Sequence, residues 1–171
     1  MTGPNIGLVL DPDLNRLTPG AQDLLRHWQA GRAPNSDAAL PLRAAFDPLI
    51  LRRFLGNLLI VDIERTRPGV PAQTGDSRFR YRLIGTDVVE LSGRDMTGRY
   101  FEDVYDPVAL AEMRYCFGWV ADSRRPARVF GTFRHAHRAF MTFDALFLPV
   151  ATEEAAGDAA QIIGYVEPTR S

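Results

Sequence analysis

One stretch in the middle of the chain, residues 78–93, constrains the fold more than any other. Three arginines alternate with three apolar residues over 78–83. An alternation of period two predicts a β-strand with one buried face. The strand is predicted to end at Gly85, and a short helix, capped by Thr86 and stopped at Gly93, is predicted to follow. A strand that turns at glycine into a short helix can border a small cavity.

Three further helices are predicted to begin at pairs in which a capping residue precedes proline, namely Thr18-Pro19, Asp47-Pro48 and Asp106-Pro107. The first side chain of each pair can accept a hydrogen bond from the helix N-terminus, and proline suits the first helical position. The helix predicted at about 18–30 has one apolar stripe. The helix from 107 to about 122 is apolar on two faces, which is typical of a central or interface element.

Strands are predicted at about 58–64, 78–84, 127–136, 140–151 and 161–167, and Ile6–Leu10 is a candidate for an additional edge strand. The last three strands follow one another in hairpin order. This order predicts an α+β fold with an antiparallel sheet and helices on one face.

Composition narrows the function classes. The formal net charge is −1, which argues against a nucleic-acid partner. A single cysteine excludes an intramolecular disulfide. We find no signal peptide and no apolar run long enough to span a membrane, and we therefore expect a cytoplasmic protein without a membrane partner.

Two stretches, RYRLIGTDVVELSGRDMTGRYFEDV and HWQAGRAP…LPLRAAFDPLILRRFLGNLLIVDI, together with the order of the elements, resemble PAS domains. The resemblance covers about residues 24–167 and is closest to a bacterial family of single-domain PAS proteins. It implies five antiparallel strands in the spatial order 2-1-5-4-3, with helices across one face that enclose a ligand cavity. We expect a PAS-like domain at 46–168, preceded by an N-terminal extension at 1–45 that contains the amphipathic helix.

The resemblance also implies a sensory or regulatory module in signal transduction, and not an enzyme. Such a module acts through a ligand in its cavity, through protein–protein interaction, or through both. No kinase, cyclase or DNA-binding segment flanks the PAS-like stretch, so the output is expected to pass through a partner protein or through self-association.

Seven apolar or aromatic side chains are expected to point into the cavity. Methionines and aromatic rings together make an adaptable apolar lining. The sequence does not identify the ligand beyond a small apolar molecule, and a filled core is the alternative. The seven candidates are Leu91, Met96, Tyr105, Met113, Phe117, Phe130 and Phe143.

A second set of residues is a candidate interface. Tryptophan and tyrosine are favoured interface anchors. The set comes from the N-terminal helix and from the second apolar face of the long helix, and the two faces either cover each other within one chain or meet across a two-fold axis. We expect a homodimer through the N-terminal helix. The candidates are Leu24, Leu25, Trp28, Tyr115 and Trp119.

Two PAS cofactors are disfavoured by the sequence. Flavin-binding PAS photosensors use a cysteine in an Asn-Cys-Arg segment of a short helix, whereas Cys116 lies in the middle of the long helix and lacks that motif. Haem-binding PAS domains use a histidine on the long helix or a nearby loop, and 107–122 contains none. His135 and His137 have a spacing that could hold a metal ion, but no third ligand is evident, and solvated turn histidines are the better interpretation.

Two alternatives to a sensory module remain at this point. Asp62 and Asp144 lie within apolar strands, and a carboxylate inside a cavity can act as a general base, which would suit a small cavity enzyme. Strand alternation, which would direct both side chains outward, is the preferred interpretation. The second alternative is an interaction scaffold with a filled core and no ligand.

Overall fold

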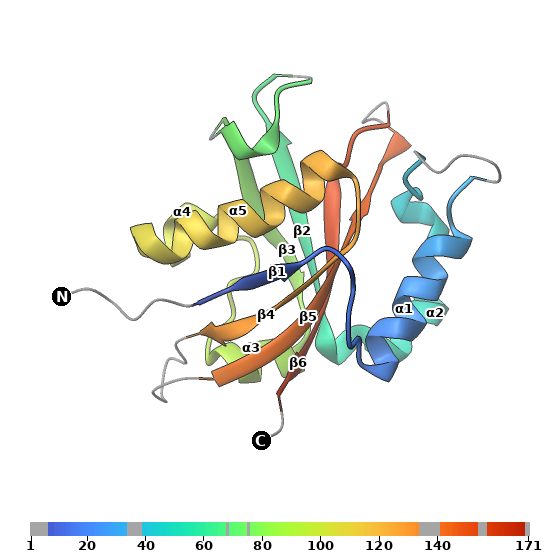
Figure 1. Ribbon diagram of the computed structural model, residues 1–171, viewed down its shortest axis with the longest axis horizontal. Helices are drawn as coiled ribbons and strands as arrows, with labels where there is room; N and C mark the ends of the chain where they lie inside the picture. The colour runs from blue at the N-terminus through green and yellow to red at the C-terminus, as the bar shows by residue number, and fades with distance from the viewer. Residues whose placement is uncertain are drawn as a thin grey trace.

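The computed structural model describes residues 7–33, 39–67, 69–74, 76–133, 141–153 and 157–169. Within them, six strands form one antiparallel sheet in the order β1-β4-β5-β6-β2-β3 (Figure 1). The strands are β1 (Val9–Asp11), β2 (Leu58–Arg65), β3 (Ser77–Ile84), β4 (Ala127–Phe133), β5 (Met141–Val150) and β6 (Gln161–Pro168). The α-helices are α1 (Pro19–Ala30), α2 (Pro48–Leu51), α3 (Thr86–Ser92), α4 (Phe101–Val104) and α5 (Pro107–Ser123). Short 3₁₀ turns are η1 (Arg43–Ala45), η2 (Arg52–Asn57) and η3 (Ala72–Thr74).

The predicted helix starts are confirmed by their capping bonds. Thr18 accepts a hydrogen bond from the Ala21 N–H at 3.2 Å, and Asp106 accepts one from the Ala109 N–H at 2.9 Å. Asp47 caps α2 in the same way. The start of α3 differs from the prediction, because Gly85 is its N-cap and no side chain caps it.

The strand order implied by the resemblance is confirmed. When β2 to β6 are counted as strands one to five, their order in the sheet is 2-1-5-4-3. The sheet has a sixth strand, because β1 pairs with β4 through Val9↔Phe130, Leu10↔Val129 and Asp11↔Arg128. The N-terminal segment therefore adds an edge strand as well as a helix.

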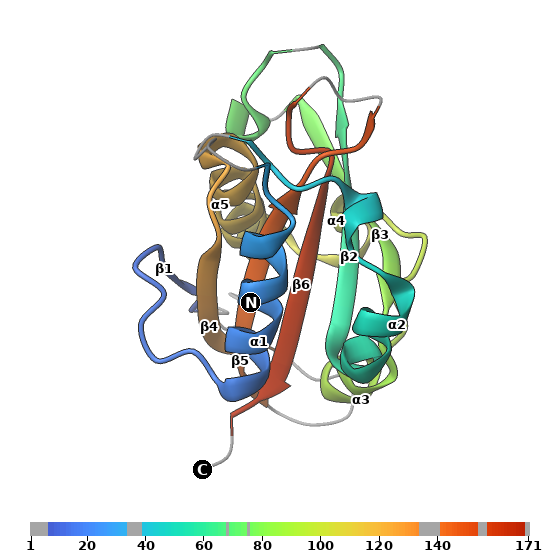
Figure 2. The same cartoon turned by 90° about the vertical axis from the view of Figure 1, so that its right-hand side faces the viewer.

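Helices lie on both faces of the sheet, because the long helix α5 packs on one face and α1 of the N-terminal extension packs on the other. Phe147 of β5 packs against Phe117 of α5, with ring centroids 4.5 Å apart. The neighbouring Leu146 points to the opposite face, where it pairs with Tyr165. Tyr165 lies directly against Gly20 of α1, so α1 packs on that opposite face, across β5 and β6 (Figure 2). We call the α5 side the inner face and the α1 side the outer face.

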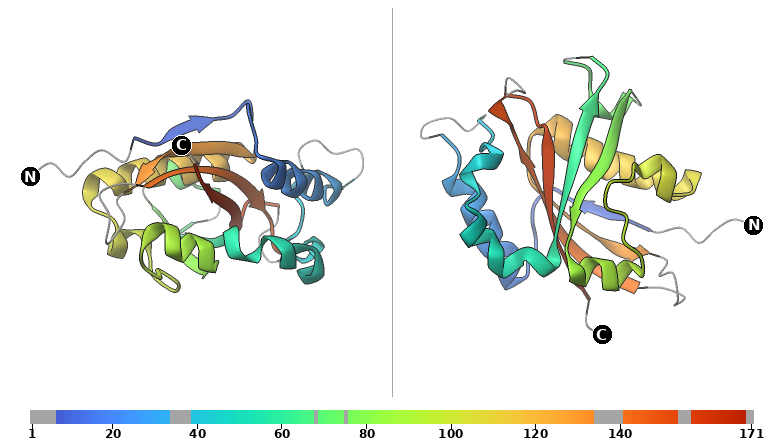
Figure 3. Two further views of the ribbon diagram at one scale, coloured as in Figure 1. Left: turned by 90° about the horizontal axis from the view of Figure 1, so that it is seen from below. Right: turned by 180° about the vertical axis from the view of Figure 1, so that it is seen from behind.

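An aromatic cluster fixes α4 and α5 against the inner face. Phe101 of α4 lies 5.4 Å from Phe79 of β3 and 5.0 Å from Phe117 of α5, measured between ring centroids. All three side chains are fully buried. The cluster connects α4 and α5 to β3, and Figure 3 shows α4 on the opposite side of the molecule from α1. The space between α3, α5 and the inner face is left for a cavity.

Candidate functional site

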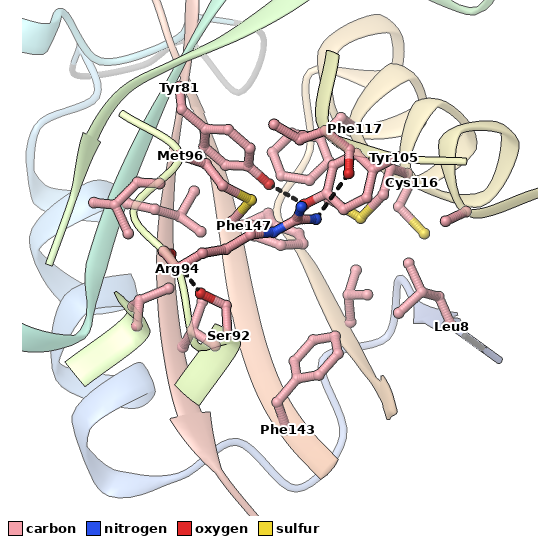
Figure 4. A pocket seen from close by; sticks show the side chains of 18 of the residues that line it. Leu8, Tyr81, Ser92, Arg94, Met96, Tyr105, Cys116, Phe117, Phe143 and Phe147 are labelled. Carbon is pink, nitrogen blue, oxygen red and sulfur yellow. Dashed lines mark hydrogen bonds between the residues drawn. The ribbon is translucent and has the colours of Figure 1, made fainter. Parts of the chain in front are cut away.

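A cavity of about 370 Å³ lies between the inner face, α3 and α5 (Figure 4). Ligand-binding cavities in proteins span about 300–1,000 Å³, so this one suits a small molecule. Every strand of the sheet except β1 contributes to its wall, together with Leu8 just before β1. Its lining consists of Leu8, Leu59, Tyr81, Ile84, Val88, Ser92, Arg94, Met96, Val104, Tyr105, Asp106, Ala109, Met113, Cys116, Phe117, Val129, Phe143, Phe147 and Val166.

A pair of tyrosines forms a polar group in this mainly apolar wall. Tyr81 comes from β3 and Tyr105 follows α4, and their hydroxyl oxygens lie 2.5 Å apart. Burial raises the pKa of Tyr81 well above its usual value, and burial also raises the pKa of Tyr105. Both side chains are therefore neutral phenols at physiological pH and can act as hydrogen-bond donors.

Arg94 lines the cavity with a side chain that is also exposed to solvent, and it supplies positive charge there. It directly follows Gly93, whose left-handed conformation, with φ of 79°, ends α3 and turns the chain. The Arg94 Nη2 donates a hydrogen bond to the Val104 carbonyl at 2.7 Å, at the end of α4. Figure 4 shows the guanidinium group beside the Tyr81–Tyr105 pair. Arg94 is not among the residues expected at the cavity from the sequence, although an arginine immediately after a helix-ending glycine was the available signal.

Five of the seven residues expected at the cavity line it, namely Met96, Tyr105, Met113, Phe117 and Phe143. Leu91 does not, because it lies on the side of α3 that borders a separate depression between α3 and the start of α1, where it is buried. Phe130 does not either. Its neighbour Val129 faces the cavity, so strand alternation places Phe130 on the outer face, where the Arg128 guanidinium lies 4.1 Å from its ring centroid.

The candidate interface residues are dispersed. Leu24 and Trp28 are buried within the chain, and the Trp28 indole N–H donates to the Pro149 carbonyl at 2.7 Å. Leu25 and Trp119 are partly buried against the core. Tyr115 is 58% exposed. The apolar stripe of α1 therefore covers the outer face of its own sheet and does not form a surface patch.

Cys116 lies in the cavity wall, in the middle of α5. Burial raises the pKa of its thiol to about 12, so the reactive thiolate form is scarce at neutral pH. His135 and His137, the other residues considered for cofactor or metal binding, lie outside the described residues. Within the ranges given above, no three His, Cys, Asp or Glu side chains gather as a metal site requires.

The two strand carboxylates lie outside the cavity. Asp62 accepts hydrogen bonds from Arg80 at 3.1 Å and from Gln161 at 2.8 Å. Asp144 accepts several from Arg128, the shortest at 2.6 Å. Each carboxylate is held by an arginine on the outer face, and neither is positioned to take a proton from a molecule in the cavity.

Comparison with known proteins places the chain in a family. The family model described as "PAS domain" matches residues 17–167. No curated protein matches the chain. Across the described residues, no helix has the length and apolar character needed to cross a membrane.

Several solved structures are similar in fold at low sequence identity. The PAS domain of Bordetella pertussis BvgS is 17% identical, with a TM-score of 0.49 over 72% of this chain and 85% of that one. A light-oxygen-voltage domain studied with a flavin analogue is 14% identical, with a TM-score of 0.48 over 75% of this chain and 89% of that one. An RNA-binding light-oxygen-voltage receptor is 17% identical, with a TM-score of 0.48 over 96% of this chain and 39% of that one. Because the family model matches nearly the whole chain, this protein belongs to the PAS domain family.

Proposed function

We propose that this chain is a sensory signalling module in which a small ligand occupies the cavity and alters the packing of the N-terminal segment. The observation that carries the proposal is the position of Leu8. Its side chain lines the cavity, and the residues that follow it form β1 and then α1. A molecule in the cavity would therefore contact the segment that leads to α1.

A short series of contacts supports this coupling. Val129 lines the cavity and pairs with Leu10 of β1. Asp11, at the end of β1, lies 3.8 Å from the Arg128 guanidinium. The Asp11 carboxylate also accepts hydrogen bonds from the backbone of the turn that leads toward α1. A change in the position of β1 would thus reach α1 through directly contacting groups.

The mechanism requires that the ligand bind two arrangements of the N-terminal segment with different affinities. A ligand shifts the packing only if it binds one arrangement of β1 and α1 more tightly than the other. The altered arrangement would then be recognised by a partner protein or by a second copy of the chain. The partly exposed face of α5 around Val108 and Tyr115 is available for such a contact.

Native mass spectrometry of the gently purified protein tests the proposal. We expect mass above that of the polypeptide, and we expect hydrogen exchange in 9–30 to change when the bound molecule is removed. Ala109→Leu places three more carbons in the cavity and should abolish the extra mass. Ala111→Leu, on the exposed side of the same helix, is the matched control and should retain it. Two results together would overturn the proposal and favour a ligand-free scaffold. The wild type would show no mass above that of the polypeptide, and its hydrogen exchange in residues 9–30 would equal that of Ala109→Leu.

A further inference from the structure

We infer that the cavity selects a small apolar monocarboxylate, with its carboxylate held by Arg94 and the Tyr81–Tyr105 pair. This inference rests on the proposed function and names the class of ligand that the cavity would take. It follows from three features of the wall, namely a spare hydroxyl proton, an uncompensated positive charge and an apolar remainder.

The tyrosine pair has one hydroxyl proton that takes no part in the hydrogen bond between the two side chains. Two hydroxyl groups carry two protons, and the single hydrogen bond between Tyr81 and Tyr105 uses one of them. The second hydroxyl proton has no acceptor among the described residues. Because both rings line the cavity, an acceptor atom of a ligand is the group that can satisfy this proton.

Arg94 adds charge and further donors. A guanidinium group has five N–H donors, and one nitrogen of Arg94 is engaged with the Val104 carbonyl. Within the described part of the chain, no carboxylate forms an ion pair with Arg94. Asp106 also lines the cavity, but its Oδ1 accepts the Ala109 N–H at the N-terminus of α5, where the helix dipole favours a negative charge. Arg94 is exposed, so water solvates its guanidinium group, and a ligand carboxylate would replace part of that water at a positively charged group.

A carboxylate satisfies both requirements. It can accept hydrogen bonds from the planar guanidinium and, on its remaining lone pairs, from the free tyrosine hydroxyl. Hydrogen bonds between ionised partners are also stronger than those between neutral ones.

The rest of the wall excludes strongly polar ligands. Apart from Arg94, the two tyrosines, Ser92 and Asp106, the wall is formed mainly by hydrocarbon, thioether and aromatic groups, including Leu59, Val88, Met96, Met113, Phe143 and Phe147. A sugar, a nucleotide or a second carboxylate would leave polar groups without partners there, which is costly in an apolar wall. An alkyl chain or a single phenyl ring would be buried favourably.

The experiment compares acids with their uncharged amides. Decanoate and 4-phenylbutyrate are titrated into the full chain by isothermal calorimetry, in parallel with decanamide and 4-phenylbutyramide. We expect each acid to bind at least about tenfold more tightly than its amide, as one charge-assisted contact predicts. Arg94→Gln should remove most of this preference, and Tyr105→Phe should reduce it with packing retained.

Arg99→Gln is the matched control. The Arg99 Nη2 donates to the Asp103 carbonyl at 3.1 Å, so this variant loses the same charge and an equivalent contact at the end of α4, outside the cavity. It should keep the preference for the acid. Equal affinity for acid and amide, or an unchanged preference in Arg94→Gln, would overturn the inference and leave the proposed function standing. Failure of all four probes would also overturn it, and the mass measurement above would then decide separately whether the cavity binds a ligand.

Discussion

Replacing Gly85 with alanine should be among the most damaging single-methyl changes in this protein. Gly85 has φ of −67°, which any residue adopts, so its role is not conformational freedom. A Cβ at Gly85 would lie 2.1 Å from the Leu55 carbonyl oxygen and 2.3 Å from the Gly56 carbonyl oxygen. Both oxygens belong to the backbone of η2 and cannot move aside as a side chain can. The Gly85 N–H also donates to the Leu58 carbonyl at 2.7 Å, and this bond would be strained as the segments separate.

Overpacking costs about 1–3 kcal/mol, and loss of a hydrogen bond adds about 1 kcal/mol, so we expect Gly85→Ala to lower the free energy of unfolding by about 2–4 kcal/mol. Urea denaturation followed by tryptophan fluorescence measures this change. Gly56→Ala is the control, because the three atoms nearest to its Cβ would all belong to the Asp87 carboxylate, at the end of a flexible side chain. It should stay within about 1 kcal/mol of the wild type. The reasoning is refuted if the two variants lose equal stability.

Three further outcomes follow from the charged and ionisable groups. At pH 8, Cys116 should react with iodoacetamide about a thousandfold more slowly than an exposed thiol, because burial raises its pKa to about 12; mass spectrometry that finds a rate near that of free cysteine would contradict this. Arg128→Gln leaves Asp144 unpaired on the outer face and should cost about 2–4 kcal/mol in urea denaturation, whereas Arg128→Lys should recover only part of it, since lysine cannot form the two-pronged contact. Because burial raises the pKa of Tyr81 and of Tyr105, the unfolded chain loses these protons first, and the free energy of unfolding should fall above about pH 10 by up to about 1.4 kcal/mol per pH unit for each tyrosine. The double Phe variant should flatten this slope, and an unchanged slope would exclude these two groups as its cause.

Most of the helices and strands could be predicted from local signals in the sequence. The pairs Thr18-Pro19 and Asp106-Pro107 start helices because each first residue provides a cap whose bond forms within three residues. The alternation over 78–83 likewise depends only on the pleat of a strand. The strand order came from the family resemblance, since pairing partners distant in sequence leave no local trace.

Positions that depend on packing between residues far apart in the sequence were harder to predict. The apolar stripe of α1 shows that the helix buries one side, but not that its partner is the outer face of β5 and β6. For Phe130, the face depends on which residues of the strand point inward. Val129 and Phe130 are successive apolar residues, so the sequence does not show which of the two does. Arg94 was missed for a related reason, because it is exposed like most arginines near turns, and only its hydrogen bond to the distant Val104 carbonyl holds it beside the cavity.

The N-terminal segment links the two faces of the sheet, and this position makes it suitable for carrying a signal. Leu8 contacts the cavity on the inner face, whereas Trp28, further along the same segment, is anchored to Pro149 on the outer face. Strand β1 crosses between them at the edge of the sheet, where it has a single neighbour, β4. An edge strand of three residues is held by few hydrogen bonds, so it can shift at lower cost than the central strands. Under the proposed function, a ligand that contacts Leu8 would therefore act on a short edge strand, and the movement would be transmitted to the helix that covers the opposite face of the sheet.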